Sequence, residues 1–329
     1  MRSPLDPWLD ARTAARLRRR RPPRPRVFAP RDSTWRDVAP DFAGAVALAR
    51  AGLAFQVAVE QRYDRSGDPR RLPRALAAGA TVYFPQVHQA LPRVARLMVA
   101  LRAGVLGPRG EACSFLFAVE GRGRVGLGLH HDGNVDSVWL QLEGRRTVTT
   151  GPPVPRGTPA DLDPHAPRRG PGWVTRDLAP GSLFYLPPRT PHDVVCHGRS
   201  LAISLTFAVS PARPPRALTA WDVVEGRVDR VPPVTRDRLW TQVPAVAGPL
   251  DRARRAFPLW LPDGTVRLPA AAHAFAARLA VMPSLTRADA RRAGAALEIL
   301  LAHGILAPQD LPRVVRPANP RALDGWRFA

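Results

Sequence analysis

Three side chains of the sequence have the types and the spacing of a metal site. His130 and Asp132 form a His-x-Asp pair, and His192 follows sixty residues after Asp132, at the end of an apolar stretch. Alternate residues of a β-strand point to the same face, so we expect His130 and Asp132 to share a face while His131 points away. Two histidines and one carboxylate on one face of a metal leave coordination positions open, as in non-heme Fe(II) oxygenases. The spacing therefore predicts an iron site.

The segments around these ligands have the pattern of short strands separated by turns. A His-x-Asp pair alone occurs by chance on many protein surfaces, so this context is what favours a metal site. Apolar or alternating stretches bounded by turn residues cover residues 138–143, 146–148, 183–186 and 201–207. Several short strands at this spacing predict a small barrel.

The motifs also follow one another in a recognisable order. After the His-x-Asp pair come an apolar strand with Gln141, the turn Gly144-Arg145-Arg146, a Pro-Gly turn before Phe184-Tyr185-Leu186-Pro187, and then His192. This order resembles the JmjC-type cupins, specifically the bacterial protein hydroxylases related to the ribosomal oxygenases, and the resemblance spans residues 72–207. It implies a mainly β chain with helical flanks, folded as a double-stranded β-helix, or jelly roll.

The resemblance implies which residues hold the cofactors. His130, Asp132 and His192 would bind Fe(II), and Arg146 would pair with the far carboxylate of the co-substrate 2-oxoglutarate. A guanidinium suits that role because it forms a planar bidentate pair with a carboxylate. Many relatives use lysine there, and this chain contains no lysine. The alternative for Arg146 is an ordinary solvated strand arginine.

The chain departs from the family pattern near the expected co-substrate pocket. Relatives often place a tyrosine on the strand before the His-x-Asp pair, where this chain has Ser114 among phenylalanines. The aromatic residue that usually follows the basic anchor is replaced by Thr147. We therefore take Ser114, and Thr206 on the later Ser/Thr-containing strand, as further candidate contacts to 2-oxoglutarate.

Three hypotheses for function follow from these residues. The first is an Fe(II)- and 2-oxoglutarate-dependent hydroxylase of a protein or peptide side chain, with ribosomal proteins among the candidates. It would couple decarboxylation of 2-oxoglutarate to succinate with hydroxylation of an unactivated C–H bond. The second keeps this chemistry but takes a small molecule or an RNA base as substrate. The third is a cupin that binds metal without turnover, because resemblance in fold does not guarantee activity.

Length and composition set further limits. The 329 residues, of which 45% are hydrophobic, can bury one substantial core and a smaller second one. Two cysteines are too few for a disulfide framework, which fits a reducing compartment. No apolar run is long enough to cross a membrane. We expect a cytoplasmic protein with no membrane partner.

The net charge of +22 is carried entirely by arginine. Such a charge favours nucleic-acid binding, but the abundance of arginine, alanine, proline and glycine also indicates a compositional bias of the genome. We predict that residues 1–40 form a basic Pro/Arg-rich N-terminal arm. Its run from Arg18 to Arg26 is most simply a solvated tether, and binding to RNA or to an acidic partner is the sharper alternative.

Three further regions follow the arm. We assign residues 41–210 to the JmjC/cupin barrel with its preceding helices, 211–267 to a linker/helical region, and 268–329 to a small C-terminal module that is helical and winged-helix-like. Ser284 and Thr286 are candidate helix caps in that module. The alternative for the module is a plain helical cap on the barrel. Related hydroxylases use such modules in protein interaction or dimerisation, so a homodimer is one expected assembly.

Overall fold

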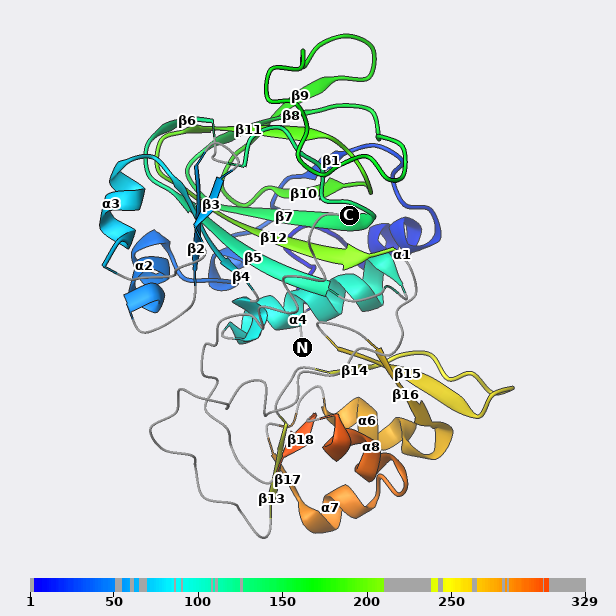
Figure 1. The fold of residues 1–329 in the computed structure, drawn as a ribbon. Coiled ribbons are helices and arrows are strands. Elements are labelled where there is room, and N and C mark those ends of the chain that lie inside the picture. Colours follow the sequence, from blue (N-terminus) through cyan, green and yellow to red (C-terminus); the bar gives the residue numbers. More distant parts are fainter. Residues whose placement is uncertain are drawn as a thin grey trace.

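A computed structural model gives the fold in two parts, a β-rich part up to residue 209 and a smaller part from residue 238 onward (Figure 1). None of the described helices has the length and hydropathy needed to span a bilayer. The structure describes residues 3–50, 55–59, 62–64, 70–85, 87–89, 91–107, 109, 112–124, 127–209, 238–241, 245–261, 265–279, 282, 284–303 and 305–307.

Two antiparallel sheets make up the β-rich part. The larger one has the strand order β1-β10-β7-β12-β5-β4-β2-β3, and the smaller one has the order β6-β11-β8-β9. Their strands are β1 Arg26–Phe28, β2 Gln56–Val59, β3 Arg62–Asp64, β4 Thr81–Pro85, β5 Ala112–Val119, β6 Arg122–Arg124, β7 Val135–Glu143, β8 Arg146–Thr150, β9 Val174–Leu178, β10 Leu183–Leu186, β11 His192–His197 and β12 Ser200–Ala208.

The inner faces of these two sheets enclose a small core of their own. Because successive side chains of a strand alternate between faces, each of these strands sends every second residue into the space between the sheets. The predicted jelly-roll barrel is confirmed. The inner core consists of Val119, Trp139, Val148, Leu178, Phe184, Leu186, Val194 and Cys196.

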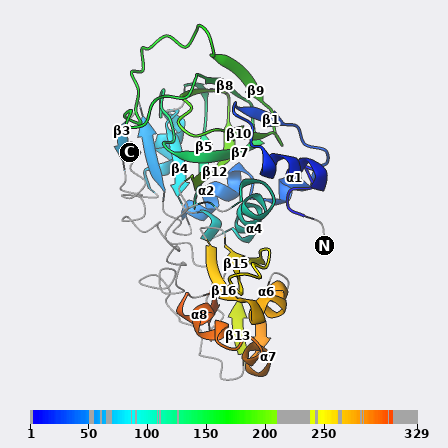
Figure 2. The ribbon, with the colours of Figure 1, turned by 90° about the vertical axis from the view of Figure 1, so that its right-hand side faces the viewer.

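Helices cover the outer face of the larger sheet and build the main core there (Figures 1 and 2). Leu97 and Met98 from the covering helix α4 belong to the same cluster as Ile203 and Phe207 from β12. The helical elements of this part are α1 Ala11–Arg19, η1 Thr34–Asp37, α2 Phe42–Arg50, α3 Leu72–Ala77, η2 Val87–Gln89, α4 Pro92–Leu101 and η3 Arg102–Leu106.

The N-terminal segment is folded onto the barrel, so the run from Arg18 to Arg26 is not the solvated tether that the sequence suggested: Arg21 pairs with Asp136 and Arg26 lies in β1. Trp8 and Leu17 are buried in the main core, and the Trp8 indole Nε1 donates a hydrogen bond to the Gly181 carbonyl at 2.6 Å. Strand β1 extends the larger sheet by pairing with β10. Apolar residues spaced three and four apart among the arginines give this segment an apolar face, which outweighs the solvation of its charges.

The C-terminal part combines two three-stranded sheets and short helices around one core. The sheets have the orders β17-β13-β18 and β14-β15-β16, and Leu239, Phe257, Phe275 and Leu300 belong to the shared core. Its elements are β13 Arg238–Thr241, β14 Val246–Ala247, β15 Ala256–Trp260, β16 Thr265–Pro269, η4 Ala270–Ala272, α6 His273–Leu279, β17 Ser284–Thr286, α7 Arg287–Arg291, α8 Ala296–Ala302 and β18 Leu306–Ala307.

This arrangement corrects the predicted boundary at residue 268. The region 211–267 was expected to be linker and helix, but its described residues from 238 onward form strands that pack into the C-terminal core. These strands are short and interrupted by proline and glycine, which hides the period of two on which strand prediction depends. Residues 210–237 and 308–329 lie outside the described part of the chain. The winged-helix-like assignment stays a prediction.

The predicted cap at Thr286 is confirmed. Its Oγ1 accepts a hydrogen bond from the Asp289 backbone N–H at 3.0 Å, at the start of α7. Ser284 lies instead in strand β17 and does not cap a helix. Helices α7 and α8 are separated by a turn in which Gly294 has a φ of 55°, a conformation that glycine adopts without steric cost.

Gly144, at the turn between β7 and β8, should tolerate no side chain. Its φ is 68°, and a Cβ at this position would collide with the Arg199 carbonyl. Gly144→Ala is expected to lower the free energy of unfolding by about 3 kcal/mol, measured by urea denaturation. Gly157→Ala is the control, because Gly157 has a φ of 83° but open space around it, and it should cost about 1 kcal/mol. Equal losses would contradict the tight turn.

Leu17 in α1 tests whether the N-terminal segment belongs to the folded core. Leu17→Ala should lower the free energy of unfolding by about 3 kcal/mol, because it deletes a side chain that is 4% exposed. Val174→Ala, at a side chain that is 44% exposed, should change it by less than about 1 kcal/mol. If the Leu17→Ala protein were as stable as the wild type in the same denaturation experiment, the N-terminal segment would not be part of the folded core.

Candidate metal centre and its pocket

The two predicted histidine ligands face each other across an isolated β-bridge. The His130 N–H donates to the His192 carbonyl at 3.1 Å, and the His192 N–H donates to the His130 carbonyl at 2.8 Å. Residues paired in this way project their side chains to the same face, and the two imidazole centroids are 4.2 Å apart. Both side chains are buried. The bridge thus joins ligands that are sixty-two residues apart in the sequence.

Asp132 approaches the two histidines from an irregular segment and not from a regular strand. The expected continuous strand through His130 and Asp132 is wrong, because strand β7 begins only at Val135 and Gly133 adopts a φ of 74°. The Ser137 hydroxyl, at the start of β7, donates a hydrogen bond to Asp132 Oδ2 at 2.6 Å. This bond fixes the carboxylate and leaves Oδ1 directed towards the histidines.

The three donor atoms form a triangle of metal-binding size. Asp132 Oδ1 lies 3.8 Å from His130 Nε2 and 3.9 Å from His192 Nε2, and the ligand atoms of all three residues lie within 4.8 Å of one another. Two donors on one face of an ion at about 2.1 Å lie about 3 Å apart, and two donors on opposite sides lie about 4.2 Å apart. The carboxylate and the imidazoles would therefore move slightly closer together around a shared ion.

The tautomers of both histidines also suit a metal. The Nδ1 of His130 lies 2.9 Å from the Gly128 carbonyl, and the Nδ1 of His192 lies 3.0 Å from the Thr190 carbonyl. A carbonyl only accepts, so each Nδ1 carries the proton and each Nε2 keeps its lone pair for a metal. Burial lowers the pKa of His192 to about 4, which keeps this imidazole neutral at pH 7. The donor set fits Fe(II).

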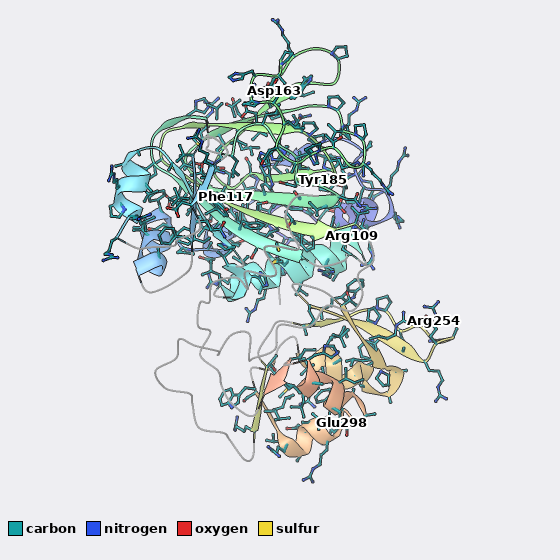
Figure 3. The ribbon with its side chains drawn as sticks, viewed as in Figure 1. Arg109, Phe117, Asp163, Tyr185, Arg254 and Glu298 are labelled. Carbon is teal, nitrogen blue, oxygen red and sulfur yellow. The ribbon has the colours of Figure 1, made fainter. Side chains whose placement is uncertain are left out.

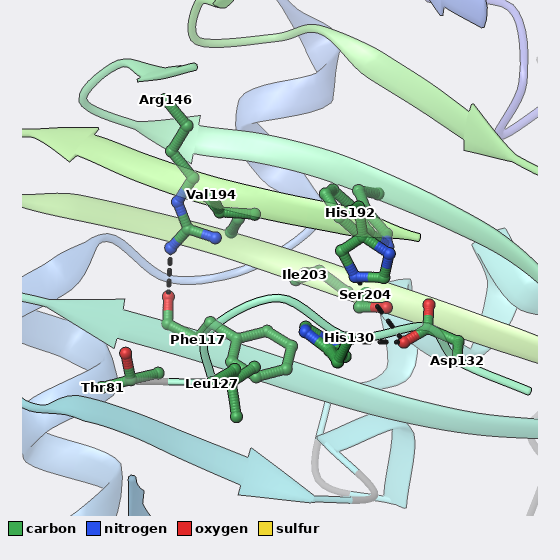
Figure 4. Close-up of a pocket in the computed structure, with 12 residues that line it drawn as sticks. Thr81, Phe117, Leu127, His130, Asp132, Arg146, His192, Val194, Ile203 and Ser204 are labelled. Atoms are coloured by element: carbon green, nitrogen blue, oxygen red, sulfur yellow. Dashed lines mark hydrogen bonds and ion pairs between the residues drawn. The ribbon is translucent and has the colours of Figure 1, made fainter. Parts of the chain in front are cut away.

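The triangle lies in a pocket between the two sheets whose empty space, including open solvent at its mouth, is about 490 Å³. The triad occupies one end and Arg146, from the start of β8, reaches in at the other (Figure 4). Asp132 is the only carboxylate among the described residues that line the pocket. The remaining lining is mostly apolar and consists of Thr81, Phe117, Leu127, Trp139, Val194, Ala202, Ile203 and Ser204.

Arg146 is held in place by a hydroxyl, a backbone carbonyl and the Cys196 side chain. Its Nε donates to the Ser200 hydroxyl at 2.7 Å, and its Nη2 donates to the Phe117 carbonyl at 3.3 Å. Gln141 Nε2 in turn donates to the Ser200 hydroxyl at 3.0 Å. Burial lowers the pKa of the Arg146 guanidinium, although an arginine still remains charged at neutral pH. Arg146 has no carboxylate partner among the described residues, so the pocket offers a buried positive charge that suits a bound carboxylate.

The other two expected co-substrate contacts do not line this pocket. Ser114 faces the main core, where its hydroxyl accepts a hydrogen bond from the His88 backbone N–H and lies 2.7 Å from His88 Nδ1. Thr206 is on the same face of β12 as Ser204, beside Ser137 in the sheet, but outside the pocket lining. The structure therefore brings together His130, Asp132, His192 and Arg146, and leaves Ser114 and Thr206 apart from them.

His131 points away from the triad, as expected, and organises the neighbouring loop. Its Nδ1 accepts from the Gly133 N–H at 3.0 Å, and its Nε2 donates to the Thr158 carbonyl at 3.1 Å. The His131 N–H donates to the Ala160 carbonyl at 3.1 Å. These bonds hold the segment between β8 and β9 beside the metal ligands.

Sequence reasoning missed the supporting residues of the site. Ser137 orients Asp132, Ser200 and Gln141 hold Arg146, and the Trp139 ring packs against His192 at a centroid distance of 5.0 Å. A sequence signal exists for Ser137, Trp139 and Gln141, because alternate residues of β7 share the inner face of the barrel. Ser200 has no comparable signal, because its position depends on how β12 pairs with β7.

Comparison with known proteins identifies the fold. Residues 111–214 match the JmjC domain family. An X-ray structure of YcfD from Escherichia coli superposes with a TM-score of 0.56 at 16% identity, covering 88% of this chain and 96% of that one. A second structure shows YcfD, described as a ribosomal oxygenase, in complex with cobalt and 2-oxoglutarate. It superposes with a TM-score of 0.51 at 16% identity and covers 86% of this chain and 94% of that one. No curated protein matches the sequence.

The Ser137 hydroxyl provides a test of metal binding that is independent of turnover. Ser137→Ala should weaken Mn(II) binding about ten-fold, because Asp132 loses the bond that orients it, as measured by isothermal titration calorimetry. Ser204→Ala is the matched control: Ser204 lines the same pocket, and no bond from it to a ligand residue is found in the described part of the chain. Unchanged Mn(II) affinity in Ser137→Ala would show that Asp132 is not a ligand.

Proposed function

We propose that this chain, of which residues 111–214 match the JmjC domain family, is a 2-oxoglutarate- and Fe(II)-dependent oxygenase that hydroxylates protein or peptide side chains. The observation that carries the proposal is the pocket with a His-Asp-His triad at one end and an uncompensated buried arginine at the other. Such a pocket can hold a metal chelator that also bears a distant carboxylate.

The pocket residues have distinct roles in this reaction. His130, Asp132 and His192 would hold the iron and leave positions open on one side, and Arg146 would bind the far carboxylate of 2-oxoglutarate. With both bound, the iron would let 2-oxoglutarate react with dioxygen, which yields carbon dioxide, places one oxygen atom in succinate and places the other in the hydroxylated product. The apolar walls formed by Phe117, Leu127 and other pocket residues exclude bulk water from that end of the pocket.

A macromolecular substrate is supported by the surroundings of the metal centre. The segment of residues 151–173 joins β8 to β9 and runs directly beside the triad, where Leu162 N donates to the Leu129 carbonyl at 3.0 Å. Many of its side chains are exposed, including Asp161 and Asp163, and Asp163 lies at the outer edge of the barrel (Figure 3). Such an exposed segment next to the pocket provides surface for a polypeptide. The similarity to a ribosomal oxygenase supports ribosomal proteins as the substrate class.

Turnover should depend on the triad. His130→Ala and Asp132→Ala are each expected to abolish the slow conversion of 2-oxoglutarate to succinate that occurs without substrate, because each removes one of three metal ligands. The measurement is succinate formation by mass spectrometry, with His165→Ala as the control in which an exposed histidine outside the triad is removed. Succinate formation at the wild-type rate in both ligand variants would mean that the metal is bound elsewhere.

Arg146 should control affinity for 2-oxoglutarate. Arg146→Gln is expected to weaken binding of 2-oxoglutarate to the Mn(II)-loaded protein by at least about 30-fold, because it removes the buried positive charge that would pair with the far carboxylate. Binding is measured by calorimetry, and Arg146→Lys should recover part of the affinity. Arg145→Gln is the control, since Arg145 is its exposed neighbour and pairs with Asp177. Equal affinities of Arg146→Gln and Arg145→Gln would contradict the assigned anchor.

The substrate class is tested by locating the added oxygen atom. Ribosomal proteins, ribosomal RNA and a small-metabolite extract are each incubated with the wild type and with His130→Ala, and a gain of about 16 Da, one oxygen atom, is sought by mass spectrometry. The proposal predicts the gain in a protein fraction, only with the wild type. A mass gain confined to RNA or to small molecules would contradict the proposed substrate class but would still support oxygenase activity.

A further inference from the structure

The exposed face of α1 carries a row of arginines that the oxygenase site does not use. We define the arginine stripe as Arg12, Arg16 and Arg19, all of which are exposed. They lie in a segment, residues 11–30, that contains eight arginines and no aspartate or glutamate. This segment therefore holds a large share of the +22 net charge.

The spacing of the stripe places all three side chains on one side of the helix. Residues i, i+4 and i+7 lie one above the other on an α-helix, and the span from Arg12 to Arg19 is about 10 Å along the axis. Ala14 and Leu17 occupy the opposite side and are buried. The helix thus turns its apolar side to the barrel and a continuous row of guanidinium groups to solvent.

The described part of the chain does not neutralise the charges of the stripe. Among the described residues, none of Arg12, Arg16 and Arg19 forms an ion pair, whereas Arg21 pairs with Asp136 and Arg31 with Asp10. Like charges at i,i+3 and i,i+4 destabilise a helix by about 0.2–0.5 kcal/mol per pair. The stripe therefore costs stability in the free protein, and an anionic partner would remove that cost.

The stripe is presented on a fixed helix and not on a flexible arm. The Asp10 carboxylate caps α1 by accepting from the Thr13 N–H at 2.7 Å. After the helix, Arg21 Nη1 donates to Asp136 at 2.8 Å, and Arg109 and Tyr185, labelled in Figure 3, bind the same carboxylate at 2.7 Å each. Asp136 follows Asp132 by four residues, so the helix is anchored close in sequence to the metal centre.

We propose that the arginine stripe binds the phosphate backbone of a nucleic acid without reading its sequence. Guanidinium groups pair with phosphates in bidentate geometry, and a row of like charges suits a partner whose charges also repeat at short intervals. The exposed Arg20, Arg24 and Arg26 extend the basic surface beyond the helix. The stripe lies outside the pocket, so the proposal goes beyond the proposed hydroxylation and does not depend on it.

The test is the salt dependence of binding to a short fluorescein-labelled RNA duplex, followed by fluorescence anisotropy with the full chain. Each arginine–phosphate contact contributes about one unit to the slope of log K against log salt concentration. The triple variant Arg12→Gln, Arg16→Gln and Arg19→Gln should lower the slope by about two to three units and weaken binding at every salt concentration. Glutamine retains good helix propensity, and circular dichroism verifies that α1 is still folded.

A matched control separates the stripe from the net charge. Arg252, Arg267 and Arg278 are exposed arginines of the C-terminal part, and replacing all three by glutamine removes the same charge. The proposal expects this variant to retain most of the wild-type slope. Equal weakening in both triple variants, or no RNA binding by the wild type, would overturn it. The proposal would also be overturned if polyglutamate competed as strongly as unlabelled RNA, because the partner would then be an acidic protein.

Discussion

The pair of backbone hydrogen bonds between His130 and His192 is the interaction on which the metal centre depends. It joins the turn before β7 to the start of β11, and so it places two imidazoles from distant parts of the chain on one face with their Nε2 atoms towards Asp132. Asp132 is then fixed by Ser137. Since Nδ1 of each histidine is bound to a backbone carbonyl, the site is preorganised before any ion arrives. Little rearrangement should be needed to bind a metal.

The second constraint is the buried charge of Arg146. A guanidinium taken out of water is costly unless an anion or several acceptors compensate it. The described surroundings provide the Ser200 hydroxyl, the Phe117 carbonyl and the Cys196 side chain, and no carboxylate. The barrel therefore retains a residue that would be unfavourable in a purely structural core. Its position in the same pocket as the triad makes one dicarboxylate, chelated at one end and paired at the other, the ligand that satisfies both.

The chemistry of the site could be predicted from residue types, whereas its geometry could not. The three ligands and Arg146 were found from spacing and resemblance, and the structure brings them together. Alternation correctly placed His130 and Asp132 together and His131 apart from them, but the regular strand on which it was based begins only at Val135. Ser114 was misplaced because its strand is buried on both faces, so the sequence does not show which face is inner. The N-terminal arm was misjudged because dense arginines hid the apolar spacing of Trp8 and Leu17.

Anaerobic titration of the protein with Fe(II) and then 2-oxoglutarate tests most directly whether the triad and Arg146 form one site. Chelation of the keto acid by bound iron produces a weak visible charge-transfer band. The structure predicts this band in the wild type, its absence in His192→Ala, and its appearance only at much higher 2-oxoglutarate concentration in Arg146→Gln. A folded, iron-loaded wild-type protein that shows no band at saturating 2-oxoglutarate would contradict the assignment and leave a metal-binding cupin without oxygenase chemistry.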